Sequence, residues 1–381
     1  MCGRRRSGSF AMPRSEGQRI FTLILEPVKG CNLRCSYCYS DTDSGAVMSR
    51  HTLRVAVESA VQYAQRHDFT KIHILWHGGE PLLADLEFFR QAARMIAELN
   101  AGLAFQQFIQ TNGLLLDRDF CRFFRKNDVQ IGLSLDGPPD LHDALRIYPD
   151  GAKSHGRVLD KHRLLTKNGL SAGFNAVITR RSLGREKEIY RYFQALNSGF
   201  RVNPLIPMIG SQKSTPELLR QGEYGRFLCG LFDAWTGTEA MRIPISPLDV
   251  YLKAILKNAT YECQQRPMCV GSNIGVKPNG DAVLCSRFET HILGNINEMN
   301  FDALFASPFC ETIRQRAEML TDCHSCAHWT ICYGGCPHNA LVFCQNPTAK
   351  DFFCKDYQLV FGKIRRALNK LNSEGPLQGE P

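Results

Sequence analysis

The 381-residue sequence predicts an α/β protein: a partial (β/α)6 barrel followed by a cysteine-rich, metal-binding segment. Two observations predict this class. Short apolar runs alternate with amphipathic stretches from residue 21 to about residue 207, which is typical of β-α units around a parallel sheet. Sixteen cysteines, crowded toward the C-terminus, come without a recognisable secretory signal, so metal ligation is a better expectation than disulfides.

Six strands are expected in the first part of the chain, in the apolar runs 21–25, 72–76, 105–109, 129–135, 173–178 and 201–206. Helices are expected between them at 49–65, 86–99, 117–126, 156–167 and 184–196. A closed eight-unit barrel usually takes about 250 residues, and only about 190 are present here, so we expect the TIM-like barrel to be incomplete.

The domain boundaries should follow changes in this pattern. We expect an N-terminal tail (1–20), the barrel (21–210), a linker with a helical bridge (211–262), a cysteine-rich domain (263–357), and a C-terminal helix and tail (358–381). Further helices are expected at 224–235 and 358–371. Apolar periodicity fades after residue 263, so we expect the cysteine-rich domain to be held together by metal rather than by a large core.

The composition is that of an ordinary globular protein. Hydrophobic residues make up 44% and charged residues 22%, which excludes disordered, collagen-like and coiled-coil chains. No apolar stretch approaches the roughly 20 residues of a membrane-spanning helix, so we expect a cytoplasmic protein with no membrane partner. The net charge of +9 permits an acidic partner, but it does not favour nucleic acid in particular.

Three cysteines follow the first expected strand with the spacing C-x3-C-x2-C: Cys31, Cys35 and Cys38, in CNLRCSYC. Active sites of β/α proteins collect in the loops at the carboxyl ends of the strands. Three thiolates can hold three irons of a four-iron cubane and leave the fourth iron open, and an open metal position marks a catalytic site. A zinc knuckle or three buried thiols remain alternatives on the spacing alone.

The CNLRCSYC sequence resembles the signature of radical S-adenosylmethionine (SAM) enzymes, including Tyr37 before the third cysteine. The resemblance covers roughly residues 21–210. It implies that the open iron binds SAM and that the reduced cluster cleaves SAM to a 5′-deoxyadenosyl radical, which abstracts hydrogen from the substrate. A reductant such as flavodoxin or ferredoxin would supply the electron.

Three more motifs match this family in the same order, each after a later strand: GGEP (78–81), QTNG (110–113) and SLDGP (134–138). Glycine lets the backbone approach the cofactor closely. In the sulfatase-maturing branch, residues matching Ser134 and Arg146 bind the SAM carboxylate, and a guanidinium suits that group. The resemblance implies cofactor contacts from Tyr37, Gly78, Gly79, Glu80, Asn112, Ser134, Arg146 and Ile209.

The C-terminal cysteines resemble the SPASM extension of radical SAM peptide-modifying enzymes, which holds two auxiliary four-iron clusters. The resemblance implies three [4Fe–4S] clusters in total, one of them SAM-binding. One auxiliary cluster would use Cys263, Cys269, Cys285 and Cys336, and the other Cys323, Cys326, Cys332 and Cys354. The spacing alone also suits a structural zinc ribbon, and Cys344 is an alternative to Cys354 as the last ligand.

Two subgroups of these enzymes are candidates for the function. Sulfatase-maturing enzymes resemble this chain from residue 224 onward, and in them an aspartate following the cysteine that matches Cys285 is the general base. This chain has Ser286 there, and a hydroxyl is a poor proton acceptor. Asp281 and Glu289 are the candidates to replace that base.

The second subgroup builds cross-links in ribosomally synthesised peptides, and the segments WHGGEPLL, SLDGPPDLHD and DGAKSH resemble it more closely. The leading hypothesis is therefore a peptide maturase that installs a cyclophane or thioether cross-link. Residues 1–20 are too short for a separate leader-binding domain, so the barrel or the SPASM region should recognise the precursor. Arg4, Arg5 and Arg6 could meet an acidic leader or form a solvated tail.

The general base stays unidentified. We expect His77, His142 and His155 to be structural, and His324 and His328 not to be ligands because the thiolates suffice. The hypothesis of a different class is a non-catalytic iron–sulfur carrier. That hypothesis leaves the ordered GGEP, QTNG and SLDGP motifs unexplained.

Overall fold

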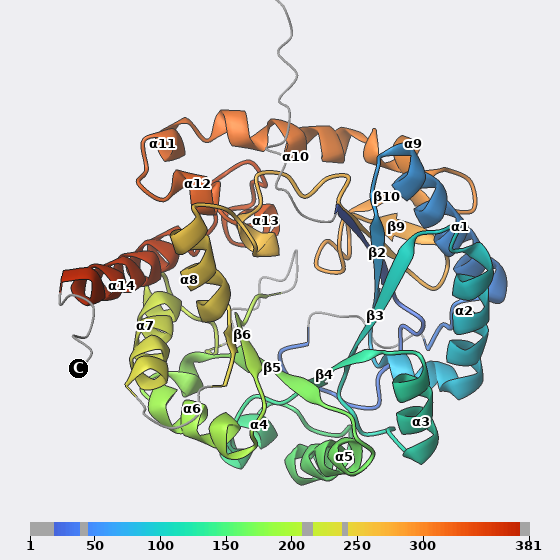
Figure 1. Cartoon of the computed structure of the whole chain (residues 1–381), viewed down its shortest axis with the longest axis horizontal. Coiled ribbons are helices and arrows are strands. Elements are labelled where there is room, and N and C mark those ends of the chain that lie inside the picture. The colour runs from blue at the N-terminus through green and yellow to red at the C-terminus, as the bar shows by residue number, and fades with distance from the viewer. Residues whose placement is uncertain (1–18, 39–44, 208–215, 238–242, 374–381) are drawn as a thin grey trace, which may run out of the picture.

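The computed structural model describes residues 19–38, 45–207, 216–237 and 243–373. A curved sheet with the strand order β10-β9-β8-β1-β2-β3-β4-β5-β6-β7 lies at the centre, and helices surround it (Figure 1). The strands are β1 (Ile20–Leu25), β2 (Lys71–Trp76), β3 (Ala104–Thr111), β4 (Gln130–Ser134), β5 (Ala172–Ile178), β6 (Phe200–Pro204), β7 (Ile245–Ser246), β8 (Asn273–Val276), β9 (Asp281–Val283) and β10 (Ile292–Asn295).

The helices fall between and after these strands. In the barrel they are α1 (Arg50–Arg66), η1 (Pro81–Ala84), α2 (Asp85–Leu99), α3 (Arg118–Lys126), α4 (Pro139–Asp143), α5 (His155–Lys167), η2 (Arg180–Ser182) and α6 (Glu186–Ala195). Beyond it are α7 (Glu223–Thr236), α8 (Leu248–Lys257), η3 (Cys263–Gln265), α9 (Phe301–Phe305), α10 (Pro308–Met319), α11 (Thr321–His324), α12 (Trp329–Cys332), α13 (Pro337–Cys344) and α14 (Cys354–Ser373).

The predicted α/β class and partial barrel are confirmed. All six expected strands form, and β1 to β6 pair in parallel with their neighbours in chain order. The register pairs Leu25 with Trp76 and Trp76 with Ile109, so the carboxyl ends of the first strands lie at one edge of the sheet. Loops that leave this edge carry the motifs found in the sequence.

Local chemistry explains where the barrel helices begin. The Ser49 side chain accepts a hydrogen bond from the Thr52 amide at the start of α1, at 3.0 Å. Asp117 caps α3 in the same way, through the amides of Asp119 and Phe120. Such caps satisfy amides that have no partner inside the helix and are worth about 1 kcal/mol each.

The cysteine-rich segment corrects one expectation. Strand β8 pairs in parallel with β1, so this segment extends the barrel sheet rather than standing beside it. Its side chains Ile274, Phe301 and Leu304 are fully buried in the same apolar core as Phe21 of β1. The expectation that metal replaces a core here was wrong, because strands of three or four residues and a helix of five residues are too short to show periodicity.

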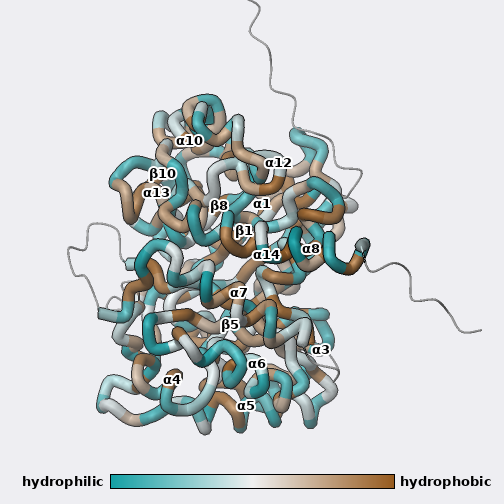
Figure 2. Tube along the Cα trace, turned by 90° about the vertical axis from the view of Figure 1, so that its left-hand side faces the viewer, coloured by the Kyte–Doolittle hydropathy of each residue, from teal (hydrophilic) through white to brown (hydrophobic). Residues whose placement is uncertain are grey.

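Hydrophobic segments gather around β1, β8 and α7 in the middle of the molecule (Figure 2). Helix α14 packs against α7, where the Asp356 carboxylate accepts hydrogen bonds from the amides of Gly222 (3.0 Å) and Gly225 (2.6 Å). The expected linker contains β7 and α8, which the sequence analysis missed. Within the described ranges, no helix combines the length and the apolar character that a membrane crossing requires.

Candidate active site

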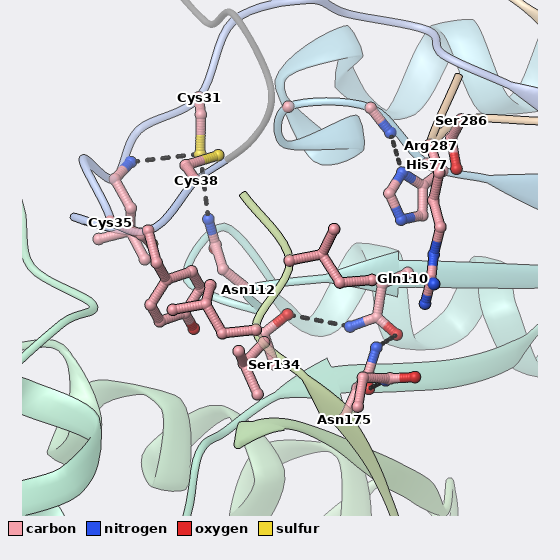
Figure 3. A pocket seen from close by; sticks show the side chains of 18 of the residues that line it. Cys31, Cys35, Cys38, His77, Gln110, Asn112, Ser134, Asn175, Ser286 and Arg287 are labelled. Carbon is pink, nitrogen blue, oxygen red and sulfur yellow. Dashed lines mark hydrogen bonds between the residues drawn. The ribbon is translucent and has the colours of Figure 1, made fainter. Parts of the chain in front are cut away.

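A cavity of about 280 Å³ opens at the carboxyl ends of the barrel strands. One wall is the loop after β1 with Cys31, Cys35 and Cys38, and the opposite end is formed by residues that include Ser286 and Arg287, after β9 (Figure 3). The cavity therefore lies between the first cysteine motif and a segment that directly follows Cys285.

The cysteine loop is fastened to the segment between α4 and α5. The amide of Arg34 donates to the carbonyl of Ile147 at 2.8 Å, and the amide of Ser36 donates to the carbonyl of Leu145 at 2.9 Å. Burial raises the pKa of the Cys31 thiol to about 12. A buried thiolate needs a nearby cation, and iron supplies that charge when it binds. Three thiols facing one cavity thus fit a cluster with one open iron.

The GGEP motif packs directly against this loop. A Cβ atom on Gly79 would lie 2.1 Å from the carbonyl oxygen of Gly30, so only glycine fits. The Glu80 carboxylate is buried and accepts hydrogen bonds from the Thr111 hydroxyl (2.6 Å) and the Asn112 amide (2.8 Å). Burial raises the pKa of Glu80 to about 7. Glu80 therefore holds the GGEP and QTNG motifs together at the cavity.

We expect Gly79→Ala to weaken SAM binding at least tenfold. The added methyl group must push the Gly30 backbone away, which costs roughly 1–3 kcal/mol and displaces the cysteine loop. Equilibrium binding of SAM to the reconstituted protein measures the effect. Gly156→Ala is the matched control, because nothing lies within 4 Å of a Cβ there. Equal affinities of the two variants would contradict the prediction.

Arg146 lines the cavity, as expected, but its guanidinium already has a partner. Its Nε and Nη2 atoms donate to the Asp136 carboxylate at 2.9 and 3.1 Å. The Tyr37 hydroxyl donates to the same carboxylate at 2.6 Å, and so does the Val177 amide at 2.9 Å. Burial favours protonation of Asp136, but Arg146, His142 and the Tyr37 hydrogen bond together outweigh it and hold the pKa of Asp136 below its usual value. A direct contact of Arg146 with SAM thus stays a prediction, and Asp136 is a residue that the sequence analysis missed.

A row of polar side chains crosses the cavity floor. Gln110 donates to the Ser134 hydroxyl at 2.9 Å, Asn175 donates to Gln110 at 3.4 Å, and Asn203 donates to Asn175 at 2.6 Å. These side chains come from β3, β4, β5 and β6 in turn. Of these four, only Ser134 was predicted to contact the cofactor, Gln110 was identified as part of the QTNG motif, and Asn175 and Asn203 were missed. The signal was present, since polar residues on inward positions of a parallel sheet are exceptional.

The far end of the cavity carries His77, Ser286, Arg287, Glu289 and His338. Burial, reinforced by Arg287, lowers the pKa of His77 to about 4 and that of His338 to about 3, so both rings are neutral at pH 7. Of the two candidates to replace the missing aspartate, only Glu289 lines this cavity. The other, Asp281, lies on β9 and accepts hydrogen bonds from Asn279 and Asn295.

The other histidines expected to be structural bond within the protein. His142 contacts the Ser154 hydroxyl at 2.9 Å, and His155 contacts the Tyr192 hydroxyl at 2.6 Å. Ile209 and the three arginines at residues 4–6 lie outside the described residues.

The structure brings the C-terminal cysteines together in two sets. Burial raises the pKa of Cys269, and Cys263, Cys285 and Cys336 raise it further because they are close neighbours. The other four line a second, smaller cavity: Cys323, Cys326, Cys332 and Cys354. Cys344 is exposed and joins neither set.

The geometry of these sets bears on the zinc alternative. Among the residues the structure describes, no three or more His, Cys, Asp or Glu side chains converge closely enough for one metal ion. A mononuclear zinc site needs such convergence, whereas a cubane spreads its four thiolates over four irons. Each set supplies four thiolates, which is the ligand number of a four-iron cubane and also of a tetrahedral zinc ion.

Comparisons with known proteins agree with this architecture. The Radical SAM superfamily profile matches residues 25–192, and the profile of the SPASM iron–sulfur cluster-binding domain matches residues 263–327. The chain is 28% identical over 352 residues to a cysteine-type anaerobic sulfatase-maturating enzyme of Clostridium perfringens, covering 89% of this chain and 95% of that protein. A serine-type enzyme of Bacteroides thetaiotaomicron is 25% identical over 381 residues, covering 92% and 91%.

Solved structures show the same fold. The structure described as native anSMEcpe with bound AdoMet superposes with a TM-score of 0.82 at 24% identity, covering 92% of this chain and 99% of that one. The structure of Streptococcus suis SuiB bound to precursor peptide SuiA superposes with a TM-score of 0.65 at 19% identity, covering 88% of this chain and 76% of that one. With the cysteine loop, the strand-end motifs and the paired cysteine sets in place, the chain belongs to the radical SAM superfamily and is a radical SAM enzyme with a SPASM iron–sulfur domain.

Proposed function

We propose that this enzyme abstracts a hydrogen atom from a ribosomally synthesised peptide and installs a cyclophane or thioether cross-link. The observation that carries the proposal is Ser286, which lines the far end of the cavity at the position where the resemblance to sulfatase-maturing enzymes implies an aspartate. Both SAM and a peptide are bound in structures of similar proteins, one with AdoMet and a Cp18Cys peptide and one with SuiA.

In this proposal Cys31, Cys35 and Cys38 hold the SAM-binding cluster. SAM, when bound and reduced there, supplies a 5′-deoxyadenosyl radical. The row from Gln110 to Asn203 orients the ligand, because amides offer both donors and acceptors to it. A target side chain enters between this row and the far end of the cavity.

The two auxiliary clusters would use the division given above, with Cys354 rather than Cys344 in the second set. Bound there, such clusters would take the one electron that the peptide loses when a cross-link forms, while 5′-deoxyadenosine carries away the abstracted hydrogen atom and the remaining proton leaves to solvent. The neutral rings of His77 and His338 and the Arg287 side chain line the far end of the cavity. Flavodoxin or ferredoxin is the class of protein that would reduce the SAM-binding cluster.

Sulfatase maturation is the second candidate, favoured by similarity along nearly the whole chain to sulfatase-maturating enzymes. In that case a carboxylate must take the proton from the substrate hydroxyl or thiol, and Glu289 is the acidic side chain placed for it. Glu289→Gln should then abolish product formation, whereas cross-linking chemistry without this base should tolerate the change.

Product analysis separates the two candidates. Reconstituted enzyme, SAM and dithionite are incubated with a sulfatase peptide or with a short peptide encoded beside the gene. Cross-linking removes two hydrogens, resists fragmentation between the joined residues and gives no hydrazide adduct. Formylglycine reacts with hydrazide. A hydrazide-reactive product from the sulfatase peptide alone would overturn the cross-linking proposal.

A further inference from the structure

A buried arginine lies between the two C-terminal cysteine sets. Arg316, on α10, is only 5% exposed. Its Nη1 atom donates to the carbonyls of Tyr333 (3.3 Å) and Gly335 (2.9 Å), and its Nη2 atom to those of Gly334 (2.8 Å) and Ala349 (2.9 Å). Arginine side chains are normally exposed, so a buried guanidinium that donates hydrogen bonds to four backbone carbonyls is unusual.

The backbone around Arg316 is shaped to present these carbonyls. Tyr333, Gly334 and Gly335 have φ angles of 47°, 77° and 75°, so three consecutive residues are left-handed. A Cβ atom on Gly334 would lie 2.3 Å from the Leu320 side chain. Left-handed residues turn successive peptide groups to one side, and glycine permits this at low cost. The loop thus forms a pocket of carbonyl oxygens, and the Arg316 guanidinium fills this pocket.

This loop joins the two cysteine sets. It runs from Cys332, in the second set, to Cys336, in the first. Asp351 also holds this loop. Its carboxylate accepts a hydrogen bond from the Cys336 amide at 2.7 Å, and its own amide donates to the carbonyl of Gly334 at 2.9 Å. The contact of Arg316 with Ala349 fastens the segment that leads to Cys354.

The charge of Arg316 also lies between the sets. Burial lowers the pKa of Arg316, while Cys336, Asp351, Cys269 and Cys332 raise it because they are nearby anions when ionised. The guanidinium stays charged, because arginine does not lose its proton in proteins. Its Nε atom is buried without a hydrogen-bond partner among the described residues. Backbone carbonyls carry no net charge, so their hydrogen bonds leave the positive charge of Arg316 uncompensated. This charge can therefore attract the thiolates of both cysteine sets.

We propose that Arg316 is a positioning residue shared by both auxiliary clusters, and this inference rests on the proposed ligand division. Arg316 fixes the loop that gives one ligand to each cluster and places one positive charge between them. A cubane with four thiolates is an anion and gains a further negative charge on reduction. A fixed cation therefore stabilises the reduced form and raises the reduction potential of both clusters.

The test compares Arg316→Gln, Arg316→Lys and the control Arg314→Gln, in anaerobically reconstituted full-length enzyme. Arg314 lies on the same helix and pairs with Glu311 at the surface. We expect Arg316→Gln to lose about eight of about twelve irons, four per auxiliary cluster, while still cleaving SAM at the first cluster. The lysine keeps the charge with fewer donors, so that variant should keep more iron. Any auxiliary clusters left in the glutamine variant should have lower potentials than those of the lysine variant.

Iron counting and electron paramagnetic resonance during a redox titration give the readouts. Full iron with unchanged auxiliary potentials in Arg316→Gln would overturn the inference. So would iron loss from a single cluster, or equal losses in the Arg314→Gln control. An unsubstituted enzyme that binds only about four irons would instead refute the ligand division itself.

Discussion

Cys35→Ala is expected to reduce SAM cleavage to the background rate. With one of the three loop thiolates removed, the cluster loses an iron ligand and no longer forms with a single open iron. Among the described residues, the cysteines that line the cavity are Cys31, Cys35 and Cys38, so no fourth thiol stands there to replace Cys35. Chromatographic detection of 5′-deoxyadenosine in a reaction with SAM and dithionite measures the loss.

Cys344→Ala is the matched control, because its thiol belongs to neither cysteine set. This variant should retain full SAM cleavage and full iron. Turnover of SAM by Cys35→Ala above one-hundredth of the normal rate would contradict the assignment of the radical-generating cluster. Loss of iron in Cys344→Ala would instead support Cys344 as a ligand in place of Cys354.

Asp136→Ala is expected to destabilise the protein by about 3–5 kcal/mol, because it leaves the buried guanidinium of Arg146 without its counter-charge. The substitution also removes the acceptor of the Tyr37 hydroxyl and the Val177 amide. Because Tyr37 precedes Cys38, the cysteine loop should loosen as well, and SAM affinity should fall. Urea unfolding followed by circular dichroism, at matched iron content, gives the free energy.

Asp160→Ala is the control for charge removal, since the ion pair between Asp160 and Arg163 is exposed on α5 and should contribute less than about 1 kcal/mol. A destabilisation below 1 kcal/mol for Asp136→Ala would show that the Arg146 guanidinium is rehydrated or finds another partner. In that case the pair would not hold the cysteine loop.

The barrel was predictable because each of its units carries a local signal. The six predicted strands have five to eight residues and carry a recognisable apolar pattern, and the caps Ser49 and Asp117 stand where two of the helices begin. The cysteine loop and GGEP were predictable because they are short, contiguous motifs at strand ends. The cavity wall nearest Cys31 therefore followed from the sequence.

The rest depends on contacts between residues far apart in the chain. The bond from Tyr37 to Asp136 spans 99 positions, and that from Asn175 to Gln110 spans 65. No local pattern marks which polar residue meets which. Strand β8 has four residues and owes its place to pairing with β1 rather than to its own sequence pattern. Arg316 looks like any other helical arginine until the loop after Cys332 folds around it.

The pairing of β8 with β1 has a consequence for synthesis. β1 (Ile20–Leu25) leaves the ribosome early, and its partner on one side is made about 250 residues later, at the pace of translation. Until then one backbone edge of β1 has no native partner and is open to pairing with other chains. The barrel sheet therefore cannot be complete until residue 276 has been made, and a chain cut after β7 would keep that edge of β1 unpaired.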